Sequence, residues 1–292
     1  MIDKVVLITG TSSGFGKLTA QSLAKAGYTV YASMRNLSTK NAEKAAQMQN
    51  WASSNKCNLK VIDLDVTNQN TIDKALREIM QTEGRIDVLI NNAGHGSIGI
   101  TEDFTLDYVR MQFECNVFGL YNITRSVIPI MKRAGSGLIV TMSSGMGRII
   151  LPTISVYSAS KFAVEALAEG WRYELAPIGI DSVIVEPGAF PTTNFMEASF
   201  AHSPKPSGKI NDYGSLKDFG EAFEHNMKEM INSGNAGDPQ DVANAVVNLI
   251  NMPQGSRPLR TVVDKMNEGV LNSLNQTSDE MESHLLQAFQ LV

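Results

Sequence analysis

Short apolar runs alternate with longer amphipathic stretches along this 292-residue sequence, and this alternation restricts the folds open to it. Seven runs are rich in β-branched residues, and several are hydrophobic on successive residues instead of on every second residue. Continuous hydrophobicity indicates strands that are buried on both faces, as in a parallel sheet. The expected strands are 4–9, 28–33, 59–66, 86–91, 137–143, 180–187 and, with a weaker pattern, 259–264.

The stretches between these runs have the spacing of amphipathic helices. The expected helices lie at about 15–27, 39–54, 68–82, 105–133, 155–176 and 238–252. Strands and helices that alternate over this length are typical of an α/β fold. We therefore expect a three-layer, doubly wound parallel sheet of about seven strands, formed by a single domain over residues 1–292.

Two segments break the alternation. Residues 189–237 form a long insertion between the sixth and seventh expected strands, and residues 265–292 continue as a helical pattern beyond the last strand. Because long insertions in compact domains are often lids or binding loops, we interpret 189–237 as a substrate-loop insertion and 265–292 as a C-terminal helical extension. Apolar residues recur in the insertion at three- and four-residue spacing. They predict a helix that packs against the domain or also walls an apolar pocket: Leu216, Phe219, Phe223, Met227 and Met230.

The charge and cysteine content exclude several classes of partner. The net charge is −5 and no dense Lys/Arg run is present, which argues against binding to nucleic acid or to an anionic membrane. Cys57 and Cys115 lie far apart without metal-ligand spacing, so we expect two free thiols and no metal site. The N-terminal run lacks the features of a signal peptide, and no apolar stretch reaches the roughly 18 residues of a membrane span. We expect a soluble, cytoplasmic protein.

A glycine-rich loop, TGTSSGFG at 9–16, connects the first expected strand to the first expected helix. Glycine lets the backbone approach a ligand closely, and a helix N-terminus offers free N–H groups and partial positive charge to a phosphate. Its G-x-x-x-G-x-G spacing differs from the common G-x-G-x-x-G. The loop predicts a dinucleotide-binding site made by Gly10, Ser12, Ser13, Gly14, Phe15 and Gly16.

The following strand ends favour one cofactor. The second strand ends in ASMRN, without the acid that would bind the ribose hydroxyls of NAD. Arg35 there matches the extra phosphate of NADP, with Ser33 and Ser13 as helpers, although it could also be a surface residue. Asp65, followed by Val66, could hold the adenine amino group or cap the next helix. The cofactor site is extended by Asn92, Ala93 and Gly94 in NNAG, which closes the fourth strand.

These pieces resemble one family. TGTSSGFG, NNAG, CNVFG (115–119), VTMSSG (140–145), YSASK (157–161) and EPG (186–188) appear in the order found in the single-domain short-chain dehydrogenases/reductases. The resemblance covers roughly residues 1–265 and implies a Rossmann-like fold that binds a nicotinamide cofactor. It also implies a homodimer or homotetramer, often formed through the two long helices at 105–133 and 155–176.

The resemblance further implies a catalytic tetrad, which is carried here by Asn116, Ser144, Tyr157 and Lys161. The adjacent Ser143 is the alternative to Ser144, which has the family's usual spacing of thirteen residues before the tyrosine. Lys161 is implied to bind the nicotinamide ribose as well, and Asn116 to hold a water in a proton relay. The nicotinamide carboxamide is implied to lie beside Pro187, Gly188 and Thr192, with Thr193 as the alternative threonine.

The chemistry follows from the charges. Carbonyl reduction leaves negative charge on oxygen, which Ser144 can stabilise and Tyr157 can protonate. A free tyrosine has a pKa of about 10, and an ammonium four residues along the helix would lower it. We therefore expect an NADP(H)-dependent carbonyl reductase or alcohol dehydrogenase for a hydrophobic or aromatic ketone, aldehyde or alcohol.

The candidate pocket residues are Phe190, Phe195, Met196 and Phe200. An NAD-dependent alcohol dehydrogenase is the alternative, and an inactive cofactor-binding regulator is a further one, against which the intact tetrad argues.

Overall fold

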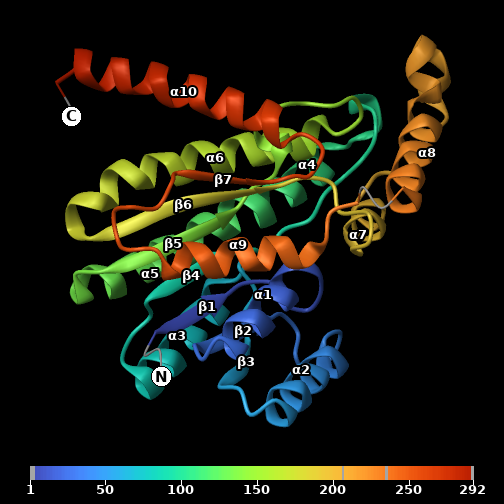
Figure 1. Ribbon diagram of the computed structural model, residues 1–292. Helices are drawn as coiled ribbons and strands as arrows, with labels where there is room; N and C mark the ends of the chain where they lie inside the picture. Colours follow the sequence, from blue (N-terminus) through green and yellow to red (C-terminus); the bar gives the residue numbers. More distant parts are fainter. Residues whose placement is uncertain (1–3, 206, 234–235, 291–292) are drawn as a thin grey trace.

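The computed structural model describes residues 4–205, 207–233 and 236–290 (Figure 1). Its centre is a seven-stranded sheet in the order β3-β2-β1-β4-β5-β6-β7, and every neighbouring pair is parallel. The strands are β1 (Val5–Ile8), β2 (Thr29–Met34), β3 (Leu59–Asp63), β4 (Val88–Asn91), β5 (Gly137–Met142), β6 (Ile180–Pro187) and β7 (Arg260–Val263). The predicted doubly wound parallel sheet is confirmed.

Side chains of each strand alternate between two hydrophobic cores, one on each face of the sheet. In β1, Val5 and Leu7 enter one core, and Val6 and Ile8 enter the other. The first core is covered by α3 (Gln69–Glu83), α5 (Leu120–Ala134) and α6 (Ser155–Leu175). The second is covered by α1 (Gly14–Lys25), α2 (Ala42–Ser54) and α9 (Pro239–Asn251). Burial on both faces explains the continuous hydrophobicity of the strands.

The helix expected at 105–133 is divided into three parts. It consists of α4 (Leu106–Phe113), a π-helical turn at Glu114–Gly119 and then α5. Gly119 packs so closely that a Cβ there would lie 2.6 Å from Cγ2 of Val66. Single π turns within helices often occur at functional sites, and this one carries Asn116. Apolar periodicity does not detect such a turn, because the pattern continues through it.

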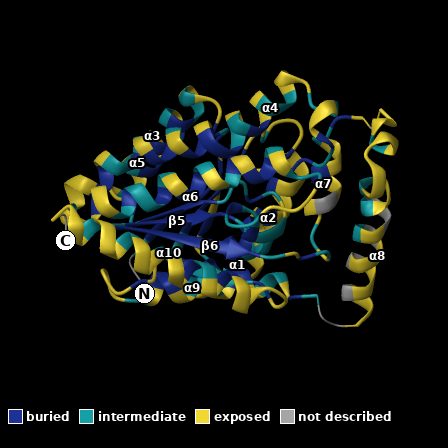
Figure 2. Ribbon diagram, turned by 90° about the horizontal axis from the view of Figure 1, so that it is seen from above, coloured by how far each residue is buried: buried dark blue, intermediate teal, exposed yellow. Residues whose placement is uncertain are grey.

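The insertion forms α7 (Phe195–Ala201), two 3₁₀ turns (Lys209–Asp212 and Gly214–Asp218) and α8 (Phe219–Asn232). Figures 1 and 2 show α7 and α8 beyond the carboxyl ends of the strands. Phe219 and Phe223 stack on α8 with ring centroids 6.0 Å apart, and both are half-buried, as is Leu216. The side chains of Met227 and Met230, the other members of the predicted apolar stripe, lie outside the described residues.

The C-terminal extension forms α10 (Glu268–Ala288), which crosses β7 and α6 (Figure 1). It covers the edge of the sheet, where an open strand would otherwise present unpaired backbone groups. In the described part of the chain, no helix is both long enough and apolar enough to span a membrane.

Candidate active site

The glycine-rich loop packs directly against the end of β4. Gly10 has a φ of +70°, and a Cβ there would lie 2.8 Å from Cα of Ala93. A Cβ at Gly16 would collide with the side chain of Asn92. Glycine is therefore required at both positions, because the backbones of the loop and of NNAG occupy the space of a side chain.

Thr9 and Asn92 hold these two segments together. Asn92 Nδ2 donates to the carbonyls of Thr9 and Gly10, each at 2.8 Å. Thr9 Oγ1 accepts from the backbone N–H groups of Asn92 and Ala93, each at 3.0 Å. Sequence reasoning missed Thr9 as a site residue, and its position as the last residue before the first glycine was the available signal.

The loop leaves open space at the N-terminus of α1. Gly14 has a φ of +55°, and a Cβ there would meet no atom of another segment within 4 Å among the described residues. Ser13 precedes the helix in an extended conformation, and within the described chain its side chain forms no capping hydrogen bond. Among the described residues, the first turn of α1 contains no acidic side chain. This end of α1 therefore fits an anionic group such as a dinucleotide phosphate.

Arg35 and Asp65 meet at the adjacent strand ends. Arg35 Nη1 lies 3.9 Å from Asp65 Oδ2, and both side chains are accessible to solvent. Asp65 Oδ1 accepts from the backbone and hydroxyl of Thr67, whereas α3 is capped by Asn68, so Asp65 does not cap that helix. Ser33 is fully buried, which makes it a poor helper for an exposed phosphate. A cation and an acid thus both face the place where the adenosine end of the cofactor is expected.

The side chain of Val66 does not face this edge. It is buried in the core against Gly119. Any contact of Val66 with a cofactor would have to come from its backbone.

Tyr157 and Lys161 lie one turn apart on α6, behind the end of β5. The Tyr157 side chain is buried, and Lys161 Nζ donates to the Met142 carbonyl at 2.6 Å. Nζ lies 6.0 Å from the centroid of the phenol ring. The two side chains therefore face the same side of the helix, as their spacing predicts.

The predicted lowering of the tyrosine pKa does not occur in this structure. Burial raises the pKa of Tyr157 to about 12, and a hydrogen bond with Ser144 opposes the shift. Burial also lowers the pKa of Lys161 to about 8. The expectation fails because desolvation of the phenolate outweighs an ammonium that is directed toward a backbone carbonyl.

The two candidate serines face different neighbours. Ser144 hydrogen bonds to the Tyr157 phenol, and its hydroxyl accepts from the Met146 N–H at 3.1 Å. Ser143 is buried against Gly147, where a Cβ would lie 2.8 Å from its hydroxyl. The geometry supports Ser144, rather than Ser143, as the partner of the tyrosine.

Asn116 uses its side chain to hold a loop. Its Oδ1 accepts from the backbone N–H of His95 at 3.0 Å, and its Nδ2 donates to the His95 carbonyl at 3.0 Å. Nδ2 also lies 3.1 Å from the Ser160 hydroxyl, which donates to the Tyr157 carbonyl at 2.7 Å. Asn116 thus joins the segment after NNAG to the helix that carries Tyr157. Its predicted role in a water relay stays a prediction.

His95 lies next to the predicted site and was not identified from the sequence. Its ring stacks on His202 of the insertion, with centroids 4.3 Å apart. Burial, followed by the nearby charges of His202, Arg35 and Lys161, lowers the pKa of His95 to about 4. His95 is therefore neutral near pH 7. Its place directly after NNAG was the only available sequence signal.

The insertion contributes one aromatic side chain beside the tyrosine. The Phe195 ring lies 5.7 Å from that of Tyr157. Phe190 instead belongs to the core and packs edge-on against Phe15 at 5.2 Å, so Phe15 also serves packing. Phe200 faces solvent. The side chain of Met196 lies outside the described residues.

The segment after β6 carries the predicted residues Gly188 and Thr192. Gly188 packs against Asp264, whose carboxylate occupies the space of a Cβ. The Thr193 hydroxyl donates to the Phe190 carbonyl at 2.8 Å, whereas Thr192 is exposed. The exposure of Thr192 and the hydrogen bond of Thr193 support Thr192, rather than Thr193, as the threonine available to a ligand.

Known proteins resemble this chain in sequence and in fold. A family model described as short chain dehydrogenase matches residues 4–203. The chain is 32% identical over 292 residues to a 3-ketodihydrosphingosine reductase of Bacteroides thetaiotaomicron, covering 99% of this chain and 98% of that protein.

Two similar solved structures contain different cofactors. A gluconate 5-dehydrogenase from Burkholderia cenocepacia, in complex with NADP and tartrate, is 25% identical with a TM-score of 0.71, covering 90% of this chain and 94% of that one. A 3-ketoacyl-(acyl-carrier-protein) reductase from Brucella melitensis, complexed with NADH, is 25% identical with a TM-score of 0.73, covering 91% of this chain and 98% of that one.

Proposed function

This chain belongs to the short-chain dehydrogenase family, and on that premise we propose that it interconverts a hydrophobic ketone or aldehyde and its alcohol with NADP(H). At the coarser level it is an NAD(P)-dependent oxidoreductase that acts on CH–OH groups. The observation that carries the proposed chemistry is the juxtaposition of the Tyr157 phenol with Ser144 and Lys161.

The residues of this chain have separable roles in the proposed reaction. A bound nicotinamide cofactor supplies or accepts the hydride. The open N-terminus of α1 and the loop braced by Asn92 would bind its phosphates. Ser144 would donate a hydrogen bond to the carbonyl oxygen, and Tyr157 would give that oxygen a proton. Lys161 would hold positive charge behind the phenol.

The raised tyrosine pKa suits reduction. A phenol with a pKa of about 12 stays protonated through the neutral range, so the proton donor is present. Lys161, with a pKa of about 8, loses its charge as the pH rises through that value. We therefore expect the rate of carbonyl reduction to be level near neutrality and to fall above about pH 8, as measured by a pH–rate profile of kcat. A profile that rises steadily from pH 7 to 10 would contradict these assignments.

Arg35 is the proposed source of a preference for NADPH. Its guanidinium is accessible at the end of β2 and can pair with the additional phosphate. We expect Arg35→Ala to reduce kcat/KM for NADPH by about tenfold or more while changing that for NADH little, because one charge-assisted contact is worth roughly 1.5–3 kcal/mol. Lys40→Ala, at an exposed position on the same connection, is the control.

The opposite outcome has a defined meaning. If Arg35→Ala leaves the ratio of kcat/KM for NADPH to kcat/KM for NADH unchanged, the NAD-dependent alternative gains support. Asp65 favours that alternative, because its carboxylate lies 3.9 Å from Arg35 and offsets the positive charge. Met34→Asp is a poor test of the preference, because Met34 is only 2% exposed and the substitution would bury a carboxylate.

The proposed substrate is hydrophobic. Phe195 places an aromatic ring beside Tyr157, and the Bacteroides relative is a 3-ketodihydrosphingosine reductase. The function is tested by a panel of aromatic, steroid-like and long-chain ketones and aldehydes, supplied with NADPH or NADH and followed at the nicotinamide absorbance. We expect turnover of apolar carbonyls with NADPH. Cofactor binding without turnover across the panel would support an inactive regulator instead.

The proposal includes one dinucleotide-binding domain that assembles into a homo-oligomer. Both helical layers pack on a single sheet. Large apolar side chains are exposed on the surface of α4, the π-helical turn, α5 and α6: Met111, Phe118, Tyr121 and Phe162. Such a surface is typical of an interface between copies. Light scattering on the purified protein would give the number of subunits.

A further inference from the structure

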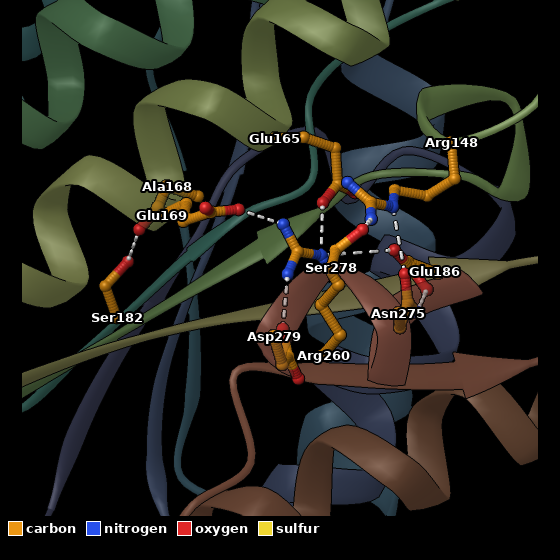
Figure 3. Close-up of polar contacts among 10 residues, drawn as sticks. All are labelled: Arg148, Glu165, Ala168, Glu169, Ser182, Glu186, Arg260, Asn275, Ser278 and Asp279. Atoms are coloured by element: carbon orange, nitrogen blue, oxygen red, sulfur yellow. Dashed lines mark hydrogen bonds and ion pairs between the residues drawn. The ribbon is translucent and has the colours of Figure 1, made fainter. Parts of the chain in front are cut away.

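A buried ionic cluster joins α6, β6, β7 and α10 (Figure 3). At its centre is Arg260 of β7, whose side chain is 3% exposed. Arg260 Nε donates to Glu165 at 3.0 Å, and Nη2 contacts Glu169. Glu186 lies 3.6 Å from Nε, and Asp279 lies 3.3 Å from Nη1. Burying a guanidinium with several acids costs desolvation free energy, so a role beyond stability is a reasonable hypothesis for this cluster.

Glu165 connects this cluster to the candidate active site. It follows Lys161 by four residues on α6, so the two side chains share one face of the helix. Gly147, three residues after Ser144, packs into the corner between them. A Cβ there would lie 2.8 Å from the Ser143 hydroxyl, 3.0 Å from Cγ of Glu165 and 3.2 Å from the Lys161 carbonyl. Gly147 of the serine loop therefore packs against Glu165 and against the backbone of Lys161.

The C-terminal extension encloses the cluster. Arg148, at the end of the serine loop, donates to Asn275 at 2.9 Å and to Ser278 at 2.6 Å. Asn275 in turn donates to Glu186 at 2.6 Å. Leu271 is buried against Gly145, the residue after Ser144. Helix α10 thus contacts the serine loop and the strand end behind it, which fixes the surroundings of Glu165.

We propose that Glu165, held by Arg260 and enclosed by α10, is a positioning residue for Lys161. Glu165 lies one helical turn from Lys161, and its negative charge favours the charged form of the lysine, whose ammonium is held by the Met142 carbonyl. This inference rests on the proposed function, because it assigns Glu165 to the support of a proposed catalytic lysine.

The electrostatic surroundings are consistent with this role. The pKa of Lys161 is lowered by burial and raised by Glu165 and by Cys115 of the π-helical turn. Burial raises the pKa of Glu165, while Arg260 of β7 lowers it. Other groups act on the same carboxyl: Ser143 and Arg148 favour its charged form, and its negative charge raises the pKa of Glu186 of β6. Removing the Glu165 charge should therefore lower the pKa of Lys161.

The test compares two matched substitutions. Glu165→Gln and Glu169→Gln each remove one carboxylate from Arg260 and from the same helix, but Glu169 lies one turn farther from Lys161. Lysine labelled with ¹³C at Cε reports its own protonation by NMR, and loss of a signal in Lys161→Arg assigns Lys161. We expect Lys161 of the wild-type protein to titrate near pH 8. In Glu165→Gln it should titrate at a lower pH, and in Glu169→Gln it should titrate at the same pH as in the wild type.

Each outcome decides the inference. An unchanged Lys161 titration in Glu165→Gln, or an equal shift in Glu169→Gln, would overturn it. If Glu165→Gln does not fold, Glu165→Asp replaces it. That variant keeps the charge but retracts it by one methylene, so a smaller downward shift is expected and no shift would overturn the inference.

A kinetic measurement separates this inference from the proposed function. In Glu165→Gln the alkaline fall in kcat should move to lower pH with the NMR titration, while KM for the cofactor stays the same. Absence of turnover in the wild-type chain would refute the proposed function, whereas the NMR titration would still decide the role of Glu165.

Discussion

Replacement of Tyr157 by phenylalanine is expected to lower turnover by about 10²–10⁴-fold, the usual contribution of a positioned general acid. The loss corresponds to roughly 3–5 kcal/mol of transition-state stabilisation. The fold should persist, because the ring is buried and only its hydroxyl is removed. Ser144 keeps its hydrogen bond from the Met146 N–H at 3.1 Å, so the serine loop should also stay in place.

Cofactor affinity provides the control for this variant. Fluorescence titration with NADPH should give nearly the wild-type dissociation constant, because the phosphate loop and Arg35 lie on other elements. Tyr173→Phe, which removes a tyrosine hydroxyl from an exposed position on the same helix, should retain full turnover. Wild-type turnover in Tyr157→Phe would refute Tyr157 as the proton donor.

Replacement of Arg260 by methionine is expected to have the largest effect on stability. The substitution keeps the apolar length of the side chain but leaves Glu165, Glu169 and Glu186 without their shared cation. Breaking a buried ion pair by removing one partner typically costs about 3–5 kcal/mol. For a chain of this size we expect Tm to fall by roughly 10 °C. The measurement is a thermal melt at pH 7.

An exposed ion pair gives the comparison. Arg110 lies 3.3 Å from Asp107, and these side chains are 68% and 90% exposed. Arg110→Met should therefore change the free energy of unfolding by less than about 1 kcal/mol. Equal melting temperatures for the Arg260 and Arg110 variants would show that the buried cluster contributes no more to stability than an exposed ion pair.

Much of the fold was predictable because hydrophobic periodicity reflects burial directly. All seven strands of the sheet were expected, and strands that are hydrophobic on successive residues, without alternation, indicated a parallel sheet. The single helix expected over 105–133 was wrong, since the π-helical turn at Glu114–Gly119 leaves the apolar pattern intact. That turn depends on close packing of Gly119 against Val66, a contact between distant residues.

The candidate site was predictable where short motifs carry it. Thr9 was missed although it is the first residue of TGTSSGFG, and His95 and Glu165 were missed because they belong to no motif. The pKa of Tyr157 was also out of reach. Its shift depends on how completely the phenol is desolvated, and residue spacing along a helix does not reveal that.

The most direct test of the proposed activity follows a labelled hydride. The wild-type protein is mixed with an apolar ketone and NADPH that carries deuterium at the transferable position, and the product is analysed by mass spectrometry. We predict an alcohol with deuterium on its carbinol carbon, formed rapidly by the wild type and very slowly by Tyr157→Phe. Tight binding of NADPH without any labelled alcohol, across the panel of ketones and aldehydes, would contradict the account.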